Sequence, residues 1–221
     1  MIRQGFALFD MDGTVTEGDS ILPMIRYAIK TGFAKKMHLA PVVWGFIGYS
    51  FGWLDDTRAK EMALAFLKGK TVSEVKTFAE DFCRDILLKS VFPAAREEMT
   101  KHLNDGRRIL LVTASPDFYL QPLIQELNLS GIIGTRADIS PEGVYTGRIS
   151  GRNCRGMEKT LRVAEYLAAA GFELDTEDSY AYGDSSHDWP MMTLAGHPVA
   201  VNAKKKLLAH CGDCTKVTWK F

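Results

Sequence analysis

Apolar residues recur along the chain in two patterns, which predict strands and helices in alternation. The run FALF at Phe6–Phe9 is short and wholly apolar, as expected of a strand buried on both faces of a sheet. RRILLVTAS at 107–115 has the same character and predicts a central strand whose carboxyl end lies at Thr113. Further strands are predicted at 132–139, 144–149, 179–186, 197–203 and 216–220, the first two paired across the turn SPEG.

Other stretches repeat apolar residues at helical spacing and predict amphipathic helices. Thr71 and Glu74 have the spacing of a capping box at the start of one helix, and Pro122 interrupts another. These helices are predicted at 57–70, 71–89, 92–106, 116–129 and 156–171.

The order of these elements predicts an α/β fold. Strands that alternate with helices in the second half imply a Rossmann-like, three-layer core with a central parallel sheet and right-handed crossovers. A helical block interrupts this alternation directly after the first strand. We therefore predict a core made of residues 1–16 and 91–221, with a small helical cap, residues 17–90, inserted into it.

Composition narrows the class of protein. The chain has 221 residues, of which 46% are hydrophobic and 24% charged, and its 27 basic and 27 acidic residues cancel. This is the profile of a soluble globular protein, and no overall charge attracts nucleic acid or an anionic surface. The N-terminus shows no secretory signal, so we expect a cytoplasmic protein. Cys211 and Cys214 have the spacing of half a zinc site; with no second pair in the sequence, we expect a reduced surface turn there.

One segment qualifies this picture. Residues 37–54, MHLAPVVWGFIGYSFGWL, contain no Asp, Glu, Lys or Arg. The run is borderline in length for a membrane span, and its proline and glycines weaken it as one continuous helix. We favour buried cap helices, with Trp44 and Trp53 in the cap core. A peripheral membrane contact through 37–54 stays open as the alternative, and no stable span is expected.

Polar side chains follow three of the predicted strands at their carboxyl ends, where open parallel sheets bind ligands. These are Asp10 and Asp12, Thr113 with Ser115, and Asp184 with Ser185 and Asp188; Lys159 lies near the start of a helix. Clustered carboxylates repel one another, and a hard dication such as Mg²⁺ relieves this. A hydroxyl and an ammonium group beside them would cradle a phosphate. The set suits phosphoryl transfer.

The motifs DMDGT at 10–14 and GDSSHD at 183–188, with Thr113 and Lys159 between them, resemble those of the haloacid dehalogenase superfamily of phosphatases. The helical insertion resembles the small-cap subclass that includes phosphoserine phosphatase. The resemblance implies that Asp10 is the nucleophile that becomes an aspartyl-phosphate and that Asp12 is the general acid and base. It also implies Mg²⁺ ligands at Asp10, Asp12 (through its backbone carbonyl), Asp184 and Asp188, and phosphoryl contacts from Thr113, Ala114 and Lys159.

The substrate is less constrained than the reaction. Asp19 stands where phosphoserine phosphatases place a Glu that holds the substrate amino group, and it could equally cap the first cap helix. We expect a small phosphorylated metabolite, such as phosphoserine or another amino-alcohol phosphate. A lipid-phosphate headgroup is the alternative that fits 37–54, and an inactive phosphate-binding module is the alternative of another class.

Overall fold

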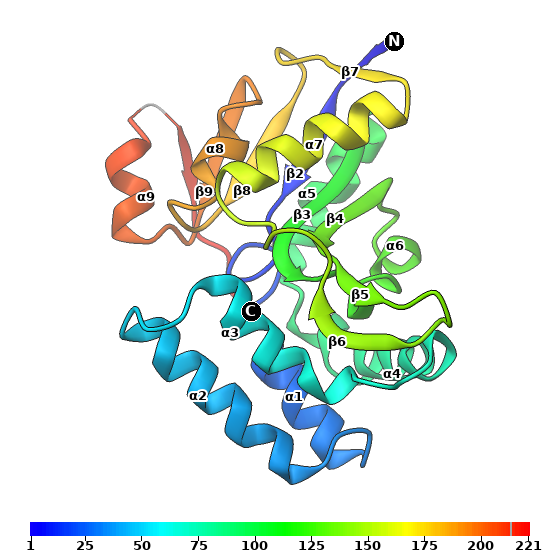
Figure 1. Ribbon diagram of the computed structural model, residues 1–221. Coiled ribbons are helices and arrows are strands. Elements are labelled where there is room, and N and C mark those ends of the chain that lie inside the picture. The colour runs from blue at the N-terminus through cyan, green and yellow to red at the C-terminus, as the bar shows by residue number, and fades with distance from the viewer. Residues whose placement is uncertain (213) are drawn as a thin grey trace.

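A six-stranded parallel sheet forms the centre of the molecule in the computed structural model, which describes residues 1–212 and 214–221 (Figure 1). Its strand order is β10-β9-β8-β2-β3-β4, so the chain starts in the middle, winds to one edge and returns to build the other. The strands are β2 (Phe6–Phe9), β3 (Arg108–Pro116), β4 (Gly131–Thr135), β8 (Tyr180–Gly183), β9 (His197–Val201) and β10 (Thr215–Val217). The predicted α/β class with a central parallel sheet is confirmed. The direction of winding reverses around β2, the position where such sheets bind ligands.

Two apolar layers cover the faces of this sheet. Ala7 and Phe9 contribute to one layer, and Phe6 and Leu8 to the other, because successive strand side chains point to opposite faces. Helices α5 (Pro93–Asn104) and α6 (Leu123–Glu126) bury residues in the first layer. The second layer is covered by α7 (Met157–Ala169), α8 (Trp189–Met192) and α9 (Lys205–His210). A separate two-stranded sheet joins β1 (Ile2–Gln4) to β7 (Phe172–Leu174).

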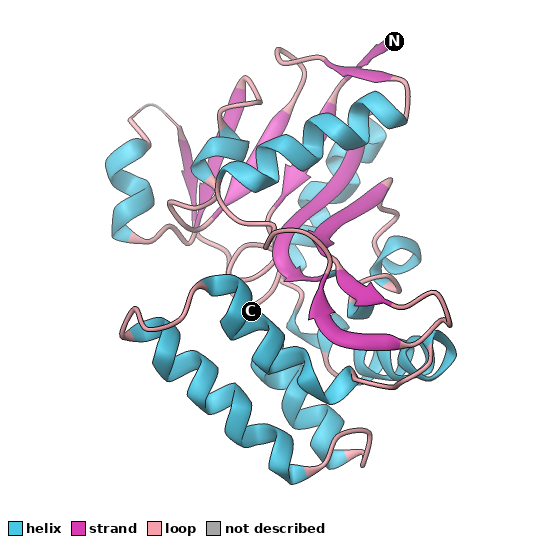
Figure 2. Cartoon of the chain, in the orientation of Figure 1, coloured by secondary structure: helices cyan, strands magenta, loops and turns pink. Residues whose placement is uncertain are grey.

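Residues 17–90, which we call the cap, hold four α-helices near the carboxyl edge of the sheet (Figures 1 and 2). They are α1 (Ile21–Lys30), α2 (Leu39–Ser50), α3 (Asp56–Leu64) and α4 (Val72–Asp85). The two ends of the segment are joined, because the Glu17 N–H donates to the Ser90 carbonyl at 2.9 Å. The antiparallel pair β5 (Ala137–Ile139) and β6 (Tyr145–Ile149) comes from a later part of the chain, yet it packs against α3.

Local structure follows the sequence in most elements and departs from it in several. The strand predicted at 132–139 is divided into β4, which pairs with β3, and β5, which alone pairs with β6. The capping box of Thr71 and Glu74 forms at the start of α4. The helix predicted at 116–129 is reduced to a 3-10 turn and the short α6, because Pro122 separates them. Strand β3 continues to Pro116 instead of ending at Thr113, and its pairing with β4 is irregular between Val112 and Pro116. Thr113 lies within this irregular stretch, at the edge of the sheet where the candidate site lies.

Segment 37–54 differs from the favoured prediction. Residues 39–50 form the single helix α2, with Pro41 in its first turn, where a missing N–H costs little. Trp44 and Trp53 are 62% and 71% exposed, so the prediction that they belong to the cap core is wrong. The helix packs through its glycines, which leaves its large side chains outside. None of the helices in the described parts of the chain is long and apolar enough to cross a membrane.

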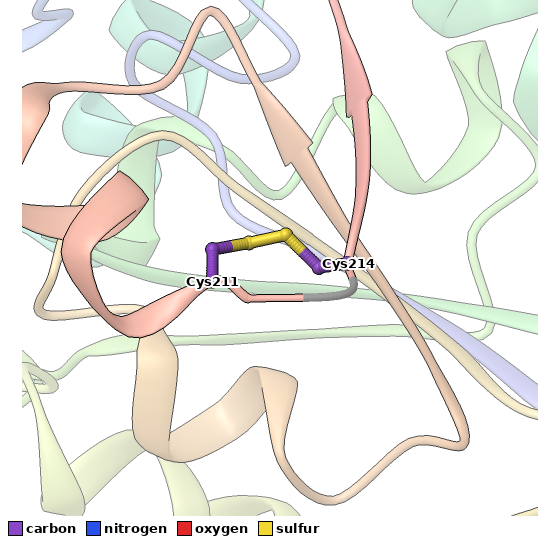
Figure 3. Close-up of a disulfide and its surroundings, with 2 residues drawn as sticks. All are labelled: Cys211 and Cys214. Atoms are coloured by element: carbon purple, nitrogen blue, oxygen red, sulfur yellow. A yellow bond between two sulfur atoms is a disulfide. The ribbon is translucent and has the colours of Figure 1, made fainter.

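The predicted reduced turn at Cys211 and Cys214 is also corrected. The two sulfurs are bonded in a disulfide, and the Cα atoms are 5.3 Å apart, within the usual range for such a bond (Figure 3). Cys211 is buried at the end of α9 and Cys214 precedes β10, so the bond joins a helix end to an edge strand. The C-x-x-C spacing alone does not distinguish a local disulfide from two thiols.

Candidate active site

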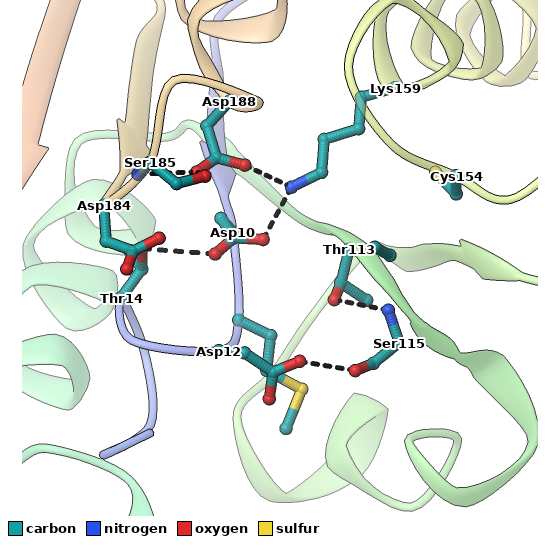
Figure 4. A network of polar contacts seen from close by, with 12 residues as sticks. Asp10, Asp12, Thr14, Thr113, Ser115, Cys154, Lys159, Asp184, Ser185 and Asp188 are labelled. Carbon is teal, nitrogen blue, oxygen red and sulfur yellow. Dashed lines mark hydrogen bonds and ion pairs between the residues drawn. The ribbon is translucent and has the colours of Figure 1, made fainter. Parts of the chain in front are cut away.

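A buried lysine and three buried aspartates meet at the carboxyl edge of the sheet (Figure 4). The Lys159 Nζ donates to Asp10 Oδ1 and to Asp188 Oδ1, both at 2.6 Å. Asp10 follows β2, Asp188 follows β8, and Lys159 lies in the first turn of α7. Three segments that are far apart in the sequence therefore bring one ammonium group against two carboxylates, as the motif pattern predicted.

Burial sets the electrostatics of this group. Burial raises the pKa of Asp10, and the neighbouring negative charge of Asp188 raises it further. Burial alone would lower the pKa of Lys159, but the two carboxylates outweigh it and raise the pKa instead. For Asp188, the ion pair with Lys159 and hydrogen bonds from Ser185 outweigh burial and lower the pKa. A proton is thus held firmly on Lys159, and Asp10 depends on nearby cations to stay ionised.

The donor set at this point fits a hard metal ion. Carboxylate oxygens of Asp10, Asp184 and Asp188 lie within 4.8 Å of one another, and all three residues are buried. Buried like charges need a cation between or beside them, and carboxylate oxygens are the ligands that Mg²⁺ prefers. Lys204 already offsets part of the charge, since its Nζ lies 2.5 Å from Asp184 Oδ2. The cluster could therefore hold a divalent cation.

Asp12 lies apart from this cluster and is held by other partners (Figure 4). Its carboxylate accepts the Ser20 N–H at 2.9 Å and the Ser115 hydroxyl. The hydroxyl groups of Tyr119 and Ser20 form a hydrogen bond of 2.8 Å, which holds Ser20 in position. Burial raises the pKa of Asp12, and the negative charge of Asp19 adds to the effect. The two aspartates of DMDGT thus occupy different environments: one beside cations, the other among hydroxyl groups.

Gly13 allows the chain that follows Asp12 to pass close to Asp184 at the end of β8. Its φ is +87°, and a Cβ built there would lie 2.5 Å from Asp184 Oδ2. Any side chain would therefore strain the backbone and displace an acidic residue of the cluster. The glycine of the motif is explained by this close approach.

Thr113 and Ala114 form one wall of a cavity of about 520 Å³ above the carboxylates. Thr113 is fully buried, and its hydroxyl oxygen accepts the Ser115 N–H at 3.0 Å. Asp10, Lys159 and Asp188 line the same cavity. All the residues that the sequence singled out for phosphoryl contacts thus share one wall or floor.

Asp19 caps the first cap helix, one of the two roles that the sequence left open, and it also lines the cavity. One of its carboxylate oxygens accepts the N–H of Ile21 at 2.9 Å at the start of α1. The residue is exposed and stands at the point where the core gives way to the cap. Asp19 therefore lies at the rim of the cavity, where only the outer part of a bound molecule could contact it.

Three contacts between cap and core were not foreseen. The Lys60 ammonium, on α3, donates to the Ala114 carbonyl in the cavity wall. The Asn153 amide donates to Asp56 at 2.9 Å, and the Arg155 guanidinium donates to the Tyr49 hydroxyl. Burial lowers the pKa of Lys60 to about 8, although the charges of Asp12, Asp19 and Asp56 oppose this. Nothing in the sequence around Lys60 separates it from the surface lysines of a helix.

Comparison with known proteins agrees with this geometry. A family model described as haloacid dehalogenase-like hydrolase matches residues 7–193. The chain belongs to the haloacid dehalogenase-like hydrolase family. The resemblance drawn from DMDGT and GDSSHD is therefore confirmed, and the matched region contains the whole buried cluster.

Several known proteins are similar over most of the chain. Protein CicA of Caulobacter vibrioides is 33% identical over 194 residues, which are 85% of this chain and 81% of that protein. Histidinol-phosphatase of Neisseria meningitidis is 28% identical, with 92% and 93% covered. Phosphoserine phosphatase SerB1 of Mycobacterium tuberculosis is 30% identical over 91% of this chain; the chain spans 66% of that relative's length.

Solved structures extend the likeness to the fold. A protein of unknown function from Bordetella pertussis has a TM-score of 0.87 and 28% identity, covering 97% of this chain and 98% of the other. A substrate-bound phosphoserine phosphatase complex has a TM-score of 0.64 at 19% identity, covering 98% and 94%. At that identity the second likeness concerns the fold alone.

Proposed function

We propose that the protein is a Mg²⁺-dependent phosphomonoester hydrolase that works through an aspartyl-phosphate at Asp10. The observation that carries the proposal is the position of Asp10, a buried carboxylate 2.6 Å from the Lys159 ammonium and within 4.8 Å of Asp184 and Asp188. A transferring phosphoryl group carries charge on its oxygens, and fixed cations around the nucleophile offset it. Names of phosphatases among the relatives support the same reaction class.

Two displacements at phosphorus complete the reaction. An Asp10 carboxylate oxygen attacks phosphorus, the bond to the ester oxygen breaks, and the leaving oxygen takes a proton from Asp12. Water then attacks the same phosphorus and gives its proton to Asp12, while the bond to Asp10 breaks and releases inorganic phosphate. The contacts from Ser20 and Ser115 hold Asp12 in place for both proton transfers.

Asp10, Asp184 and Asp188 would hold the metal ion, together with the backbone carbonyl of Asp12 that the family resemblance implies. When bound, Mg²⁺ supplies positive charge against the phosphoryl oxygens and keeps the surrounding carboxylates ionised. Lys159 ties Asp10 to Asp188, and Lys204 is paired with Asp184, so the carboxylates are oriented by the chain itself.

The charges near the rim of the cavity favour one class of substrate. Asp19 lines the cavity, and Lys60 donates to its wall from the cap side. A carboxylate and an ammonium group above the phosphoryl site suit a small phosphate ester that carries both an amino and an acidic group. We therefore favour an amino-alcohol phosphate such as phosphoserine.

A substitution at Asp10 tests the reaction. Asp10→Asn keeps the size of the side chain but removes the nucleophilic charge, so hydrolysis of an aryl phosphate with Mg²⁺ should be abolished. Asp81→Asn, at an exposed residue of α4, serves as the control and should keep full activity. Near-wild-type turnover by the Asp10 variant would contradict the proposal. Full activity of wild type in the presence of a chelator would show that the reaction needs no metal ion.

A lipid-phosphate headgroup is a second candidate, favoured by one observation. Tyr49 lies on α2 and contacts Arg155, which lines the cavity, so the uncharged helix adjoins the mouth of the site. A screen of soluble phosphate esters against a short-chain phosphatidylglycerophosphate, at equal concentration, separates the two. The favoured substrate is the one with the higher kcat/KM.

A further inference from the structure

Helix α2 carries its large apolar side chains on the outside. Trp44 and Phe46 are 62% and 72% exposed, and Phe51 and Trp53, which stack at 5.2 Å just beyond the helix, are 70% and 71% exposed. A helix at a protein surface ordinarily buries such residues and exposes polar ones. We call the exposed residues Met37, Val43, Trp44, Phe46, Phe51 and Trp53 the α2 face.

The packing of α2 against α3 explains why these side chains point away. Gly45 and Gly48 are the buried residues of α2. A Cβ on Gly45 would lie 3.1 Å from the Ala59 carbonyl, and one on Gly48 would lie 2.6 Å from a methyl group of Leu54. The close approach leaves the opposite side of the helix without a neighbour, and α2 lies at the outer edge of the molecule with α3 between it and the sheet (Figure 1). The fold is thus built to present the α2 face.

The segment that carries the α2 face is basic. Residues 20–54 contain Arg26, Lys30, Lys35 and Lys36 but no Asp or Glu, although the chain as a whole has as many acidic as basic residues. All four cations are exposed, and Lys35 and Lys36 directly precede α2. Asp55, beyond Trp53, is the nearest acidic residue in the sequence and caps α3. Exposed aromatic residues beside a basic cluster form the pattern that binds an anionic membrane surface.

We propose that the α2 face docks the protein on the surface of an anionic phospholipid bilayer. Trp44, Phe46, Phe51 and Trp53 enter the boundary between headgroups and acyl chains, and the lysines that precede α2 meet lipid phosphates. The helix has 12 residues and carries no charge, so it lies in the interface and does not span it. This placement brings Tyr49, and through it the mouth of the active site, next to the bilayer.

A second copy of the chain would cover the same residues less well. The apolar part of the face would pair with itself, but residues 20–54 offer no carboxylate to meet the lysines of the other copy. Lipid phosphates supply the missing negative charge. Self-association is therefore the competing outcome that the experiment must detect.

Sedimentation with vesicles tests the proposal. Wild type should pellet with vesicles of phosphatidylglycerol and phosphatidylcholine and stay mostly in solution with phosphatidylcholine alone. Trp44→Gln with Phe46→Gln should abolish pelleting, and Lys35→Gln with Lys36→Gln should weaken it by roughly tenfold or more. Ile2→Gln with Leu161→Gln, two exposed apolar residues of β1 and α7 far from α2 in Figure 1, should change nothing.

Two further measurements make each outcome decisive. Activity on a soluble aryl phosphate should be equal in all these variants, which shows that they are folded and keeps this test separate from the proposed reaction. Light scattering reports the oligomeric state. Wild type that stays in solution with anionic vesicles, or pellets unchanged after Trp44→Gln with Phe46→Gln, overturns the proposal. A dimer that those substitutions dissociate, without vesicle binding, assigns the face to self-association instead.

Discussion

The floor of the active site and the cap above it treat side chains in opposite ways. On the floor, Lys159, Asp10 and Asp188 are charged yet almost inaccessible, and each has a partner at 2.6 Å. In the cap, Trp44 and Phe46 are apolar yet exposed. Both arrangements oppose the usual distribution of polar and apolar residues. We proposed a ligand for each: a metal ion and a phosphate ester for the floor, and a lipid bilayer for the α2 face.

The floor and the cap are expected to serve different parts of the function. Buried charges on the floor are positioned by the ends of β2 and β8 and by α7, elements that the core packs rigidly. The cap meets the cavity through Lys60 and through the pair of Tyr49 and Arg155. We therefore expect changes on the floor to abolish the chemistry and changes in the cap to alter which substrate is accepted.

After Asp10→Asn, the largest effect is expected at Lys159. Lys159→Met leaves Asp10 and Asp188 as buried, unpaired carboxylates and removes a cation from the phosphoryl site, so kcat should fall about 10³-fold or more. Thermal unfolding should also begin at a lower temperature. Lys76→Met, at an exposed position of α4, is the matched control and should match wild type in both assays. A loss of activity smaller than tenfold would break the contrast between floor and cap.

A smaller and more selective effect is expected at Lys60 in the cap. Lys60→Gln should raise KM roughly tenfold for a phosphate ester that carries a second acidic group, and leave an aryl phosphate nearly unaffected.

The same lysine predicts a pH dependence. The pKa of Lys60 is lowered to about 8, so its positive charge is lost as pH rises through 8. The wild-type KM for the acidic ester should therefore rise above pH 8, whereas that of the variant should stay flat. Lys68→Gln, at an exposed lysine near the end of the same segment, controls for charge. Equal changes for both substrates would show that Lys60 only supports the fold.

The smallest effect is expected at His102, a buried residue of α5, and it concerns stability. Its Nε2 lies 2.7 Å from the Tyr182 hydroxyl, which donates to Glu98, and Arg107 faces its Nδ1 at 3.4 Å. We assign the proton to Nε2, because an arginine N–H points at the other nitrogen. Burial lowers the pKa of His102, with Arg107 adding to the effect and Glu98 opposing it.

The sign of the pH effect follows from this lowered pKa. As pH falls through about 6.5, His102 takes up a proton in the unfolded chain before it does so in the folded one, so stability falls. His102→Gln removes this titration, and the melting temperature of the variant should fall less between pH 7 and pH 5 than that of wild type, by on the order of a few degrees. His210→Gln, at an exposed histidine, should behave as wild type. Parallel curves for wild type and His102→Gln would show that the histidine does not titrate differently in the fold.

Much of the floor could be predicted because its chemistry lies at strand ends. Runs such as FALF and RRILLVTAS are recognisable as buried parallel strands, and the polar residues that follow them must converge at one edge of the sheet. Asp10, Thr113 and Asp184 were found in this way. The continuation of β3 past Thr113 was missed, because a bulge leaves no mark in the pattern of apolar residues.

The cap resisted prediction for a physical reason. An apolar segment indicates that water is avoided, but it does not indicate whether the neighbour is the same chain or something else. The prediction that Trp44 and Trp53 lie in the cap core is wrong for that reason, because the glycines that turn them outward act through contacts with Leu54 and Ala59 that the apolar pattern does not show. Lys60 and Lys204 were missed because their partners, Ala114 and Asp184, are distant in the sequence.

The central claim is that Asp10 carries the phosphoryl group during turnover. Rapid acid quenching of the Mg²⁺-loaded enzyme with a ³²P-labelled aryl phosphate, followed by peptide mapping at low pH, where an acyl phosphate survives, locates the covalent label. The label should appear in wild type on the peptide that contains Asp10, at up to one phosphate per chain, and should be absent from Asp10→Asn. Turnover without any covalent label, or a label that persists in the Asp10 variant, would contradict the account.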